Sequence, residues 1–541
     1  MISNQNINNR DLDTQAWNKK RIYTPENLSL ARQVLGDIQA GRKLAESVKR
    51  HPLPDGGYIG KHMLVAAYRQ LVRSGELVPD EKLLTRIRMK PVRTLSGVTT
   101  VSVLTKPYSC PGECIFCPSD IRMPKSYVPG EPGARRALEH KFDPFSQVTS
   151  RIEALEAVGH PTDKVELLVL GGTWTAYPRE YQSWFIQRCF DAMNGRDSIN
   201  LEEAHTDNEM ALHRNVGLTV ELRPDHVNPE EIIWFRQLGV TKVQMGIQSL
   251  DDHILELNQR GHSLKESRVA VDLLRAGGYK IVLHWMPNLL GATIESDRID
   301  FSRLWSSFCP DEIKIYPNQL LECTKLYQNW LRGEFTPYST EQLVELLADI
   351  KETIPRYCRV NRVIRDIPST YVVEGNKRTS LRQDVHKLME LRGRSCQCIR
   401  CREIRNQQVD LNTLAYHDLV YKTSSSEEHF LSYDTQEDYL AGFLRLSLPG
   451  DSSPNTGIEE LRGVAIIREV HIYGQSLPVG VEEAGAAQHI GLGTYLIKEA
   501  EDIARTHGFH QLAVISAIGT RTYYQKQGFE RGNLYMIKRI D

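Results

Sequence analysis

The sequence lacks any apolar run that approaches the ~18 residues needed by a membrane-spanning helix, so no membrane partner is expected. The first residues are polar and rich in Asn, unlike a secretory signal peptide. Cysteine is scarce, with 10 in 541 residues, and six of these lie in two close clusters. That distribution argues against a disulfide framework and favours metal sites in a reducing cytoplasm.

Net charge is also nearly absent, because 67 Lys and Arg are balanced by 68 Asp and Glu. The charge is unevenly distributed, however, since residues 1–95 carry 17 Lys and Arg against 9 Asp and Glu. Helical apolar spacing recurs there over 25–50, 60–75 and 81–87. Four cations follow, from Arg86 to Arg93. We therefore predict a small basic helical region over 1–95 that binds the phosphates of a nucleic acid, although a solvated helical surface gives the same charge pattern.

Three of the cysteines, Cys110, Cys114 and Cys117, have the spacing C-x3-C-x2-C. Three thiolates on one tight loop can bind three irons of a 4Fe-4S cluster and leave the fourth iron open for a substrate or cofactor. A zinc knuckle is the alternative, but a structural zinc site usually has four ligands, and no fourth Cys or His follows closely. The spacing therefore favours a catalytic iron–sulfur cluster.

From residue 96 the pattern changes to alternating strands and helices, which predicts an α/β fold with a parallel sheet closed or partly closed into a barrel over 96–370. The predicted strands are Val98–Leu104, Val165–Leu170, Gly217–Glu221, Lys242–Ile247, Tyr279–Trp285 and Glu312–Tyr316. In such sheets the chemistry lies at the carboxyl ends of the strands. Gly171 and Gly172 follow one strand there, and glycine lets the backbone approach a small zwitterion closely. A plain turn explains these glycines equally well.

Residues 371–410 interrupt this rhythm and contain the second cluster, Cys396, Cys398 and Cys401, with the spacing C-x-C-x2-C. Several arginines flank this cluster, and neighbouring cations favour the thiolate form of cysteine. Three thiolates in six residues predict a zinc-binding linker whose fourth ligand is distant in the sequence. A redox-sensitive or incidental cluster is the alternative.

Residues 411–541 have the pattern of a further α/β domain. A predicted strand over 462–471 precedes the turn Gln488–Gly493, which opens an amphipathic helix. Backbone N–H groups at such a helix start, aided by its positive dipole end, bind a pyrophosphate. A further strand follows, and then Tyr523 and Tyr524 before Gly-Phe. This order predicts an acetyl-CoA site in which a tyrosine protonates the departing thiolate, although packing alone also explains a pair of tyrosines.

The cysteine loop resembles that of radical S-adenosylmethionine enzymes, and the last 131 residues resemble the GNAT acetyltransferases. Their combination resembles the catalytic subunit of Elongator in its stand-alone prokaryotic form. Supporting motifs are Gly130-Glu-Pro, Gly171-Gly-Thr, Met245-Gly-Ile-Gln-Ser, Lys314-Ile-Tyr-Pro, Arg468-Glu-Val-His-Ile-Tyr-Gly and Gly519-Thr-Arg-Thr-Tyr-Tyr. The resemblance implies a partial TIM-like radical S-adenosylmethionine barrel followed by a GNAT acetyltransferase domain.

The resemblance also implies a tRNA-modifying enzyme that places a carboxymethyl group on carbon 5 of the wobble uridine. A radical from S-adenosylmethionine would activate the methyl group of acetyl-CoA, whose carbon would then add to the uracil. Implied partners are tRNA, through its anticodon stem-loop, and an electron donor, and a homodimer is left open. The alternatives are a protein-lysine acetyltransferase with a structural iron–sulfur domain and an RNA-binding scaffold with degenerate sites.

Roles for individual residues follow from the same resemblance. The iron ligands would be Cys110, Cys114 and Cys117. The methionine end of S-adenosylmethionine would meet Gly171, Gly172 and Thr173. Acetyl-CoA would contact Lys164 in the barrel domain, Glu469, Val470, His471 and Ile472 on the thioester strand, and Gly491, Leu492, Gly493 and Thr494 in the pyrophosphate turn. The catalytic candidates are Tyr524 and Tyr523 near the sulfur, and Lys280 and Lys314 at strand positions facing the barrel mouth.

Overall fold

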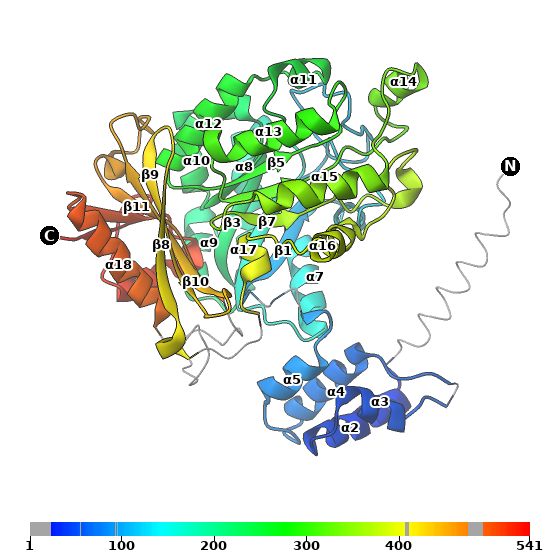
Figure 1. The fold of residues 1–541 in the computed structure, drawn as a ribbon. Helices are drawn as coiled ribbons and strands as arrows, with labels where there is room; N and C mark the ends of the chain where they lie inside the picture. Colours follow the sequence, from blue (N-terminus) through cyan, green and yellow to red (C-terminus); the bar gives the residue numbers. More distant parts are fainter. Residues whose placement is uncertain (1–22, 55, 92–93, 95, 406–409, 474–490) are drawn as a thin grey trace. The chain divides into compact units, whose positions relative to one another are not determined.

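The computed structural model describes residues 23–541 apart from 55, 92–93, 95, 406–409 and 474–490. These residues form two compact units. The first unit contains the described residues up to Thr94 together with Ser150–Thr162, and the second contains the remainder (Figure 1). No helix among the described residues is long and apolar enough to cross a membrane.

Four short helices build most of the first unit, namely α2 Pro25–Gln39, α3 Leu44–Arg50, α4 Lys61–Arg73 and α5 Glu81–Ile87. The helix predicted over 25–50 is two helices, because the chain turns at Gly41, whose φ of 91° suits glycine. Thr24 caps α2 by accepting a hydrogen bond from Asn27 N at 3.2 Å. The apolar faces of α2, α4 and α5 then share one core.

In the second unit, seven parallel strands form a sheet in the order β1-β2-β3-β4-β5-β6-β7, so each strand pairs with its neighbours in the sequence. The strands are β1 Thr99–Leu104, β2 Lys164–Leu170, β3 Arg214–Leu222, β4 Lys242–Gln248, β5 Lys280–Trp285, β6 Glu312–Ile315 and β7 Arg359–Arg362. This singly wound order, with β1 and β7 at the two edges, makes a half-barrel. The predicted parallel barrel is confirmed, with β7 as a strand that the sequence analysis missed.

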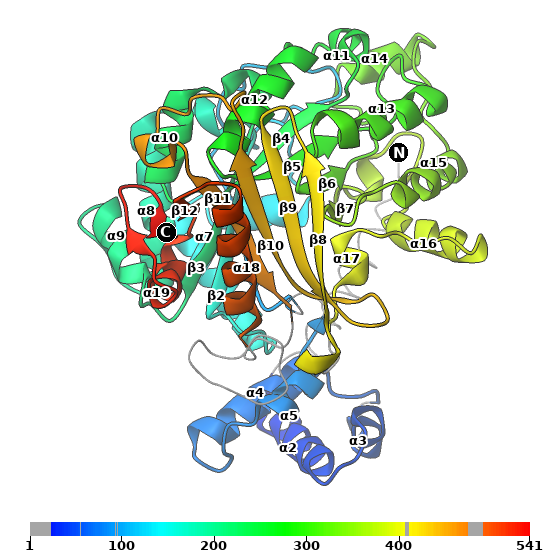
Figure 2. The same cartoon turned by 60° about the vertical axis from the view of Figure 1, so that its left-hand side comes forward.

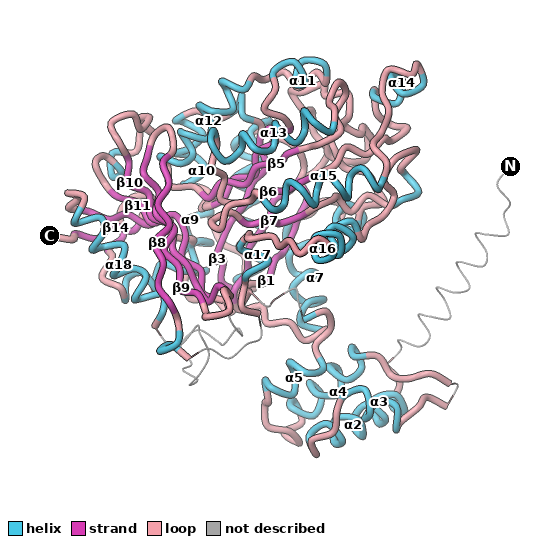
Figure 3. The backbone as a smooth tube through the Cα atoms, viewed as in Figure 1, coloured by secondary structure: helices cyan, strands magenta, loops and turns pink. Residues whose placement is uncertain are grey.

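Helices cover the outer face of this half-barrel (Figures 1 and 3). The helices between β1 and the second sheet are α6 Pro132–Glu139, α7 Pro144–Ala157, α8 Arg179–Asn194, α9 Leu201–Asn208, α10 Pro229–Gln237, α11 Asp252–Leu257, α12 Leu264–Ala276, α13 Ile294–Ser307, α14 Leu326–Leu331, α15 Thr340–Glu352, α16 Leu381–Leu391 and α17 Ile399–Arg402. Central strands such as β4 and β6 are buried along nearly their whole length, as expected for parallel strands covered on both faces.

A mixed sheet follows, in the order β13-β14-β12-β11-β10-β9-β8. Its strands are β8 Ala415–Lys422, β9 Ser426–Asp434, β10 Leu440–Pro449, β11 Ala465–Ile472, β12 Gln511–Val514, β13 Glu530–Arg531 and β14 Met536–Arg539. Two helices, α18 Leu492–Thr506 and α19 Arg521–Lys526, complete it. The apolar face of α18 packs on β10 and β11 (Figure 2). The antiparallel strands β8 to β10 were not predicted.

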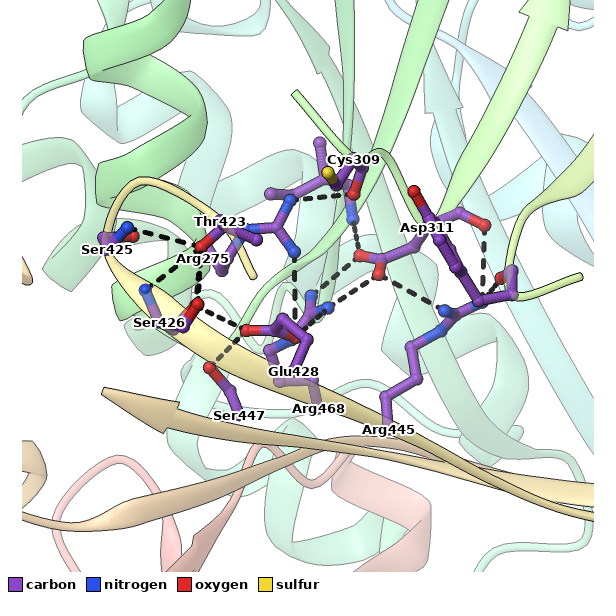
Figure 4. Close-up of polar contacts among 12 residues, drawn as sticks. Arg275, Cys309, Asp311, Thr423, Ser425, Ser426, Glu428, Arg445, Ser447 and Arg468 are labelled. Carbon is purple, nitrogen blue, oxygen red and sulfur yellow. Dashed lines mark hydrogen bonds and ion pairs between the residues drawn. The ribbon is translucent and has the colours of Figure 1, made fainter. Parts of the chain in front are cut away.

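A buried ion network joins the half-barrel to the mixed sheet (Figure 4). Asp311, which precedes β6, pairs with Arg468 of β11 and lies 3.5 Å from Arg445 of β10. Arg468 also pairs with Glu428 of β9 at 2.8 Å, and Arg275 of α12 lies 3.7 Å from the same carboxylate. All five side chains are almost completely buried. The mixed sheet therefore meets the amino ends of the barrel strands, opposite the end at which the cysteine loop begins.

Candidate functional site

The cysteine loop begins where β1 ends, at the carboxyl end of the barrel strands. Backbone hydrogen bonds fix this loop on two sides, because Ile115 N donates to Asn258 O at 3.2 Å and Leu326 N donates to Ile115 O at 2.9 Å. A further bond, from Cys117 N to Cys114 O at 3.2 Å, closes a tight turn. The loop therefore presents its thiols from an anchored backbone.

Two buried arginines, Arg223 and Arg260, lie against this loop, and the sequence analysis missed both as site residues. Arg260 Nη1 lies 3.2 Å from Cys114 Sγ, while Arg260 Nη2 donates to Gly246 O at 2.5 Å. A Cβ on Gly112 would lie 2.1 Å from Arg223 Nη1, so a larger residue there would displace this guanidinium. Arg223 Nη1 and Arg260 Nε have no hydrogen-bond partner among the described residues. Both groups are thus available to an anionic ligand of the loop.

The thiol of Cys114 is in an environment that favours the metal-binding thiolate. Its pKa is lowered to about 5, first by the hydrogen bond with Cys117 and then, against the effect of burial, by the charge of Arg260. Among the described residues, the sulfurs of this loop do not form a group within 4.8 Å of one another, whereas those of the second cysteine cluster do. Three thiols on one anchored loop are the ligand set of a 4Fe-4S cluster that leaves its fourth iron open.

The Gly171–Thr173 turn lies beside the cysteine loop, as expected for the ends of two neighbouring parallel strands. Thr173 is buried, and its Oγ1 lies 3.7 Å from Cys110 Sγ. Gly171 has a φ of 138°, and a Cβ there would lie 1.9 Å from Thr105 Oγ1. Glycine is therefore required at this position by packing as well as by any close approach of a ligand.

Further polar groups lie at the same carboxyl end of the barrel. Gln248 ends β4 and Asn288 follows β5, and both have a φ of 68°, a conformation that stores strain of ~1–3 kcal/mol at functional sites. Gln248 Oε1 and both ring nitrogens of His262 are buried without a hydrogen-bond partner among the described residues. Burial, and then the charges of Arg260 and Arg223, lower the pKa of His262 to about 3, so its ring is neutral. Gln248 could be found from the sequence because it ends a strand, whereas His262 and Arg260 lie in a loop and have no such signal.

Charged residues at the amino ends of the barrel strands meet β11. Lys280 is the first residue of β5, so it lies at the amino end and not at the barrel mouth, where the sequence analysis had placed it. It contacts Glu469 of β11 and lies 2.7 Å from Glu312. Lys314, the third residue of β6, donates a hydrogen bond to Gln244 of β4. Lys280 therefore links the barrel to the second sheet.

The predicted thioester strand corresponds to the end of β11. Glu469 is held by Lys280 and by Arg445, whose Nε lies 2.9 Å away. His471 Nε2 donates to Ser96 O at 3.1 Å, and burial lowers the pKa of His471 to about 4, so this ring is neutral. The neighbouring Val470 and Ile472 pack against the core of the mixed sheet. Lys164, the first residue of β2, lies at the amino end of the barrel, and burial lowers its pKa.

The start of α18 contains the described part of the predicted pyrophosphate turn, and Gln488 lies outside the described residues. Gly491 is the N-cap, with a φ of 76° that favours glycine. The next residue, Leu492, is buried, and Thr494 is exposed. The peptide N–H groups of this first turn are therefore in the position from which a helix start binds anions.

The two tyrosines of α19 differ in position. A Cβ on Gly493 would lie 2.5 Å from the Tyr523 hydroxyl oxygen, so this hydroxyl lies against the start of α18. Tyr524 belongs instead to the buried core of the mixed sheet. Burial raises the pKa of Tyr523 to about 12, so its hydroxyl keeps its proton at neutral pH. This geometry favours Tyr523 over Tyr524, the residue that the sequence analysis placed first.

The second cysteine cluster is compact. The sulfurs of Cys396, Cys398 and Cys401 lie within 4.8 Å of one another, and no fourth Cys, His, Asp or Glu ligand atom of the described residues belongs to this group. Lys351 is completely buried, and its Nζ lies 3.5 Å from Cys396 Sγ. Burial, and then the charge of Lys351, lower the pKa of His386 to about 4. Three convergent thiols beside a buried cation suit a zinc ion with three thiolate ligands.

Part of the basic stretch that begins in α5 serves the interior of the first unit, whereas Lys90 is exposed. Arg88 is buried, and its Nε donates to Gly159 O at 2.6 Å. Arg86 donates to Arg42 O at 2.7 Å. Because Arg88 is buried and hydrogen-bonded within the unit, contact of this stretch with RNA phosphates stays a prediction that depends on its exposed cations, and Arg93 lies outside the described residues. A run of cations in a sequence does not reveal which of them satisfy backbone carbonyls.

A half-barrel of parallel strands with a three-cysteine loop at its carboxyl end defines the class of radical S-adenosylmethionine proteins. The sequence profile of the radical SAM superfamily matches residues 106–301, and that of the radical SAM C-terminal domain matches residues 310–390. Such a domain implies a 4Fe-4S cluster and S-adenosylmethionine, and the cysteine loop fits both.

Within this class, the chain belongs to the family of the tRNA uridine(34) acetyltransferases and Elongator complex protein 3. It is 42% identical over 480 residues to the tRNA uridine(34) acetyltransferase of Methanocaldococcus infernus, a match that covers 85% of this chain and 89% of the relative. It is 36% identical to Elongator complex protein 3 of Drosophila melanogaster, covering 95% and 98% of the two chains. The solved structure of M. infernus Elp3 with an N-terminal deletion matches with a TM-score of 0.71 and 39% identity, covering 82% of this chain and 99% of that one.

Proposed function

We propose that this chain modifies uridine 34 of tRNA, the nucleotide in the names of its relatives, by adding a carboxymethyl group that derives from acetyl-CoA. One observation carries the proposal. A single compact unit contains both sites. The three-thiol loop lies at the carboxyl end of the barrel, and the glycine turn that opens α18 belongs to the sheet that meets the amino end. A radical generator and a thioester site in one unit suit a reaction at the methyl group of an acetyl thioester.

Cys110, Cys114 and Cys117 would hold three irons of the cluster, and Gly171, Gly172 and Thr173 would meet the methionine end of S-adenosylmethionine. When bound, these groups supply a 5′-deoxyadenosyl radical after one-electron reduction by an electron donor. Arg260 would keep Cys114 ionised, because its guanidinium lies 3.2 Å from the sulfur. The unpartnered Arg223 Nη1 would compensate negative charge beside the loop.

Acetyl-CoA would bind along the end of β11 and the start of α18. The N–H groups of the turn Gly491–Thr494 would bind its pyrophosphate, and residues 469–472 would line the thioester. Tyr523, whose hydroxyl lies against Gly493, would protonate the departing thiolate. Lys164 would contact acetyl-CoA from the amino end of the barrel. Lys280 would act as a positioning residue, since it holds Glu469 of β11.

We also propose four functional segments. They are a tRNA-binding region over 1–95, a radical domain over 96–370, a zinc-binding linker over 371–410 and an acetyltransferase domain over 411–541. The basic composition of the first segment supports the tRNA assignment. The three convergent thiols support the zinc assignment.

The decisive experiment starts from protein reconstituted anaerobically with iron and sulfide. It is incubated with a reductant, S-adenosylmethionine, labelled acetyl-CoA and tRNA, and the digested nucleosides are analysed by mass spectrometry. Label on the wobble uridine supports the proposal. Label on protein lysines alone, unaffected by loss of the cluster, supports the alternative of a protein-lysine acetyltransferase.

The matched control is Cys114→Ala. This variant should lose reductive cleavage of S-adenosylmethionine and uridine labelling, yet bind tRNA within about threefold of the wild type, since a loop thiol contributes no phosphate contact. Cys323→Ser, which alters an exposed cysteine outside both clusters, should retain all three activities. Loss of tRNA binding in Cys114→Ala would instead make the loop a structural element.

A further inference from the structure

A second group of metal-ligand side chains lies on the mixed sheet, away from both cysteine clusters. Glu427 and His429 are two residues apart on β9, so they share one face of the strand. His507 is the residue that caps the carboxyl end of α18. The ligand atoms of the three side chains lie within 4.8 Å of one another. Glu428, between them, points to the other face and joins the buried network at Arg468.

Hydrogen bonds fix the proton positions of both imidazoles. His429 Nδ1 lies 2.8 Å from Asp418 Oδ2, and His507 Nδ1 lies 2.8 Å from the carbonyl oxygen of Ile503. A carbonyl oxygen only accepts, and an ionised carboxylate does the same, so each Nδ1 carries the hydrogen. In the neutral rings, each Nε2 therefore holds a free lone pair.

Both Nε2 atoms lie near one carboxylate oxygen. Glu427 Oε1 lies 3.5 Å from His429 Nε2 and 3.4 Å from His507 Nε2. His429 is 5% exposed, and its Nε2 has no hydrogen-bond partner among the described residues. Lys422 Nζ lies 4.0 Å from the other oxygen of this carboxylate. Three possible ligand atoms thus converge, and either a metal ion or a proton on an imidazole would compensate the carboxylate among them.

We propose that Glu427, His429 and His507 bind a divalent transition-metal ion, with zinc as the preferred ion. Two imidazoles and one carboxylate are a common zinc ligand set that leaves a fourth position for water. Ligand atoms on a tetrahedral zinc, with bonds of about 2.05 Å, are about 3.3 Å apart, close to the separations of Glu427 Oε1 from the two Nε2 atoms. Asp418 is the positioning residue, because metal-binding histidines usually donate their other N–H to such a carboxylate.

The metal would connect the carboxyl end of α18 to β9. His507 is the exposed member of the group, with 43% of its side chain accessible, so it provides the entry path for the ion. Since α18 starts at the Gly491 turn, an ion at its far end would restrain the helix that carries the proposed pyrophosphate site. The expected direct effect is a zinc-dependent rise in thermal stability.

The test is a zinc titration of the full-length apo protein against a chromophoric chelator, with metal content measured by mass spectrometry. His507→Ala and His429→Gln should each bind one equivalent of zinc less than the wild type. Asp418→Asn should keep the site with ~10–100-fold weaker affinity. The matched control is His510→Ala, because His510 is a highly exposed histidine three residues beyond His507 and outside the group.

Zinc at the thiolate cluster is counted separately by repeating the titration in Cys398→Ser. The loss caused by His507→Ala should be the same in that background, whether or not the thiolates bind zinc. Each variant is also melted with and without zinc, so that a misfolded variant is recognised. Equal zinc stoichiometry and affinity in the wild type and His507→Ala would overturn the proposal and leave protons as the cations between these groups.

Discussion

Asp311 and Arg468 form a two-point ion pair in which neither side chain is exposed to solvent. Arg468 Nη1 and Nη2 donate to the two carboxylate oxygens of Asp311, each at 2.7 Å. Asp311 belongs to the half-barrel and Arg468 to the mixed sheet, so one carboxylate joins the two (Figure 4). Arg445 Nη1 also lies 3.5 Å from Oδ1 of the same carboxylate.

Asp311→Asn should therefore destabilise the protein strongly. The amide is nearly isosteric, but it leaves two buried guanidinium groups with less negative charge than they need. Removing one partner of a buried ion pair costs about 3–5 kcal/mol, so the denaturant midpoint should fall markedly. The control is Asp207→Asn, which breaks a partly exposed pair with Arg196 and should cost no more than about 1 kcal/mol.

The Asp311 pair also predicts a dependence of stability on pH. Burial alone would raise the pKa of Asp311, but the charges of Arg468 and Arg445 hold it far below its ordinary value. A carboxyl whose pKa is lower in the folded state than in the unfolded chain stabilises the fold by lowering the free energy of the ionised form. This stabilisation is complete above the pKa of the unfolded chain, about 3.9, and it is lost as the pH falls below that value. The difference in unfolding free energy between wild type and Asp311→Asn should be constant from pH 7 to 5 and shrink below pH 4. A constant difference down to pH 3 would contradict this account.

Tyr523→Phe should slow the tRNA-dependent loss of acetyl-CoA. A tyrosine acting as general acid contributes at least about 10²-fold to the rate, and binding of acetyl-CoA should change little because the ring remains. The measurement is the initial rate of free-thiol release. Tyr524→Phe is the matched variant, and its rate should stay near the wild-type value since Tyr524 packs in the core. The reverse order of the two effects would restore Tyr524 as the donor.

Much of the half-barrel could be predicted, because hydrophobic runs that end near Gly, Gln or Asn alternate with helical stretches. The closeness of Cys110 and Thr173 followed from the rule that parallel strands end on the same side. Arg260 could not be predicted, because it reaches Cys114 from 146 residues away in the chain. Its position in a loop carries no periodic signal.

The strands β9 and β10 were missed for a physical reason. An antiparallel strand is recognised by alternation of apolar and polar residues, but β9 and β10 bury both of their faces. Glu428 and Arg445 look like surface residues in the sequence, yet both are buried because they pair with charges from other elements. A buried ion network conceals strands from pattern analysis.

Charge reversal on α3 should weaken tRNA binding more than charge reversal in the basic stretch from Arg86 to Arg93. Lys43 and Lys49 are both exposed and lie at the two ends of α3. Lys43→Glu with Lys49→Glu should lower affinity and reduce the slope of log K against log salt by about 0.9 for each phosphate that the variant no longer neutralises. Lys265→Glu, at an exposed position on α12, serves as the control. An unchanged salt slope would remove α3 from the tRNA interface.

Cys398→Ser should release one zinc ion and lower the thermal midpoint, because a zinc site contributes its binding energy to folding. The three thiolates with one Zn²⁺ carry a net charge of about −1, and the buried Lys351 compensates it at 3.5 Å from Cys396. Lys351→Met should therefore weaken zinc binding without removing a ligand, and zinc content and melting curves measure both variants. Cys323→Ser, at an exposed cysteine, should match the wild type. Unchanged zinc content in Cys398→Ser would show that these thiolates do not hold the ion. The charge of Lys351 would then be balanced by a thiolate without a metal.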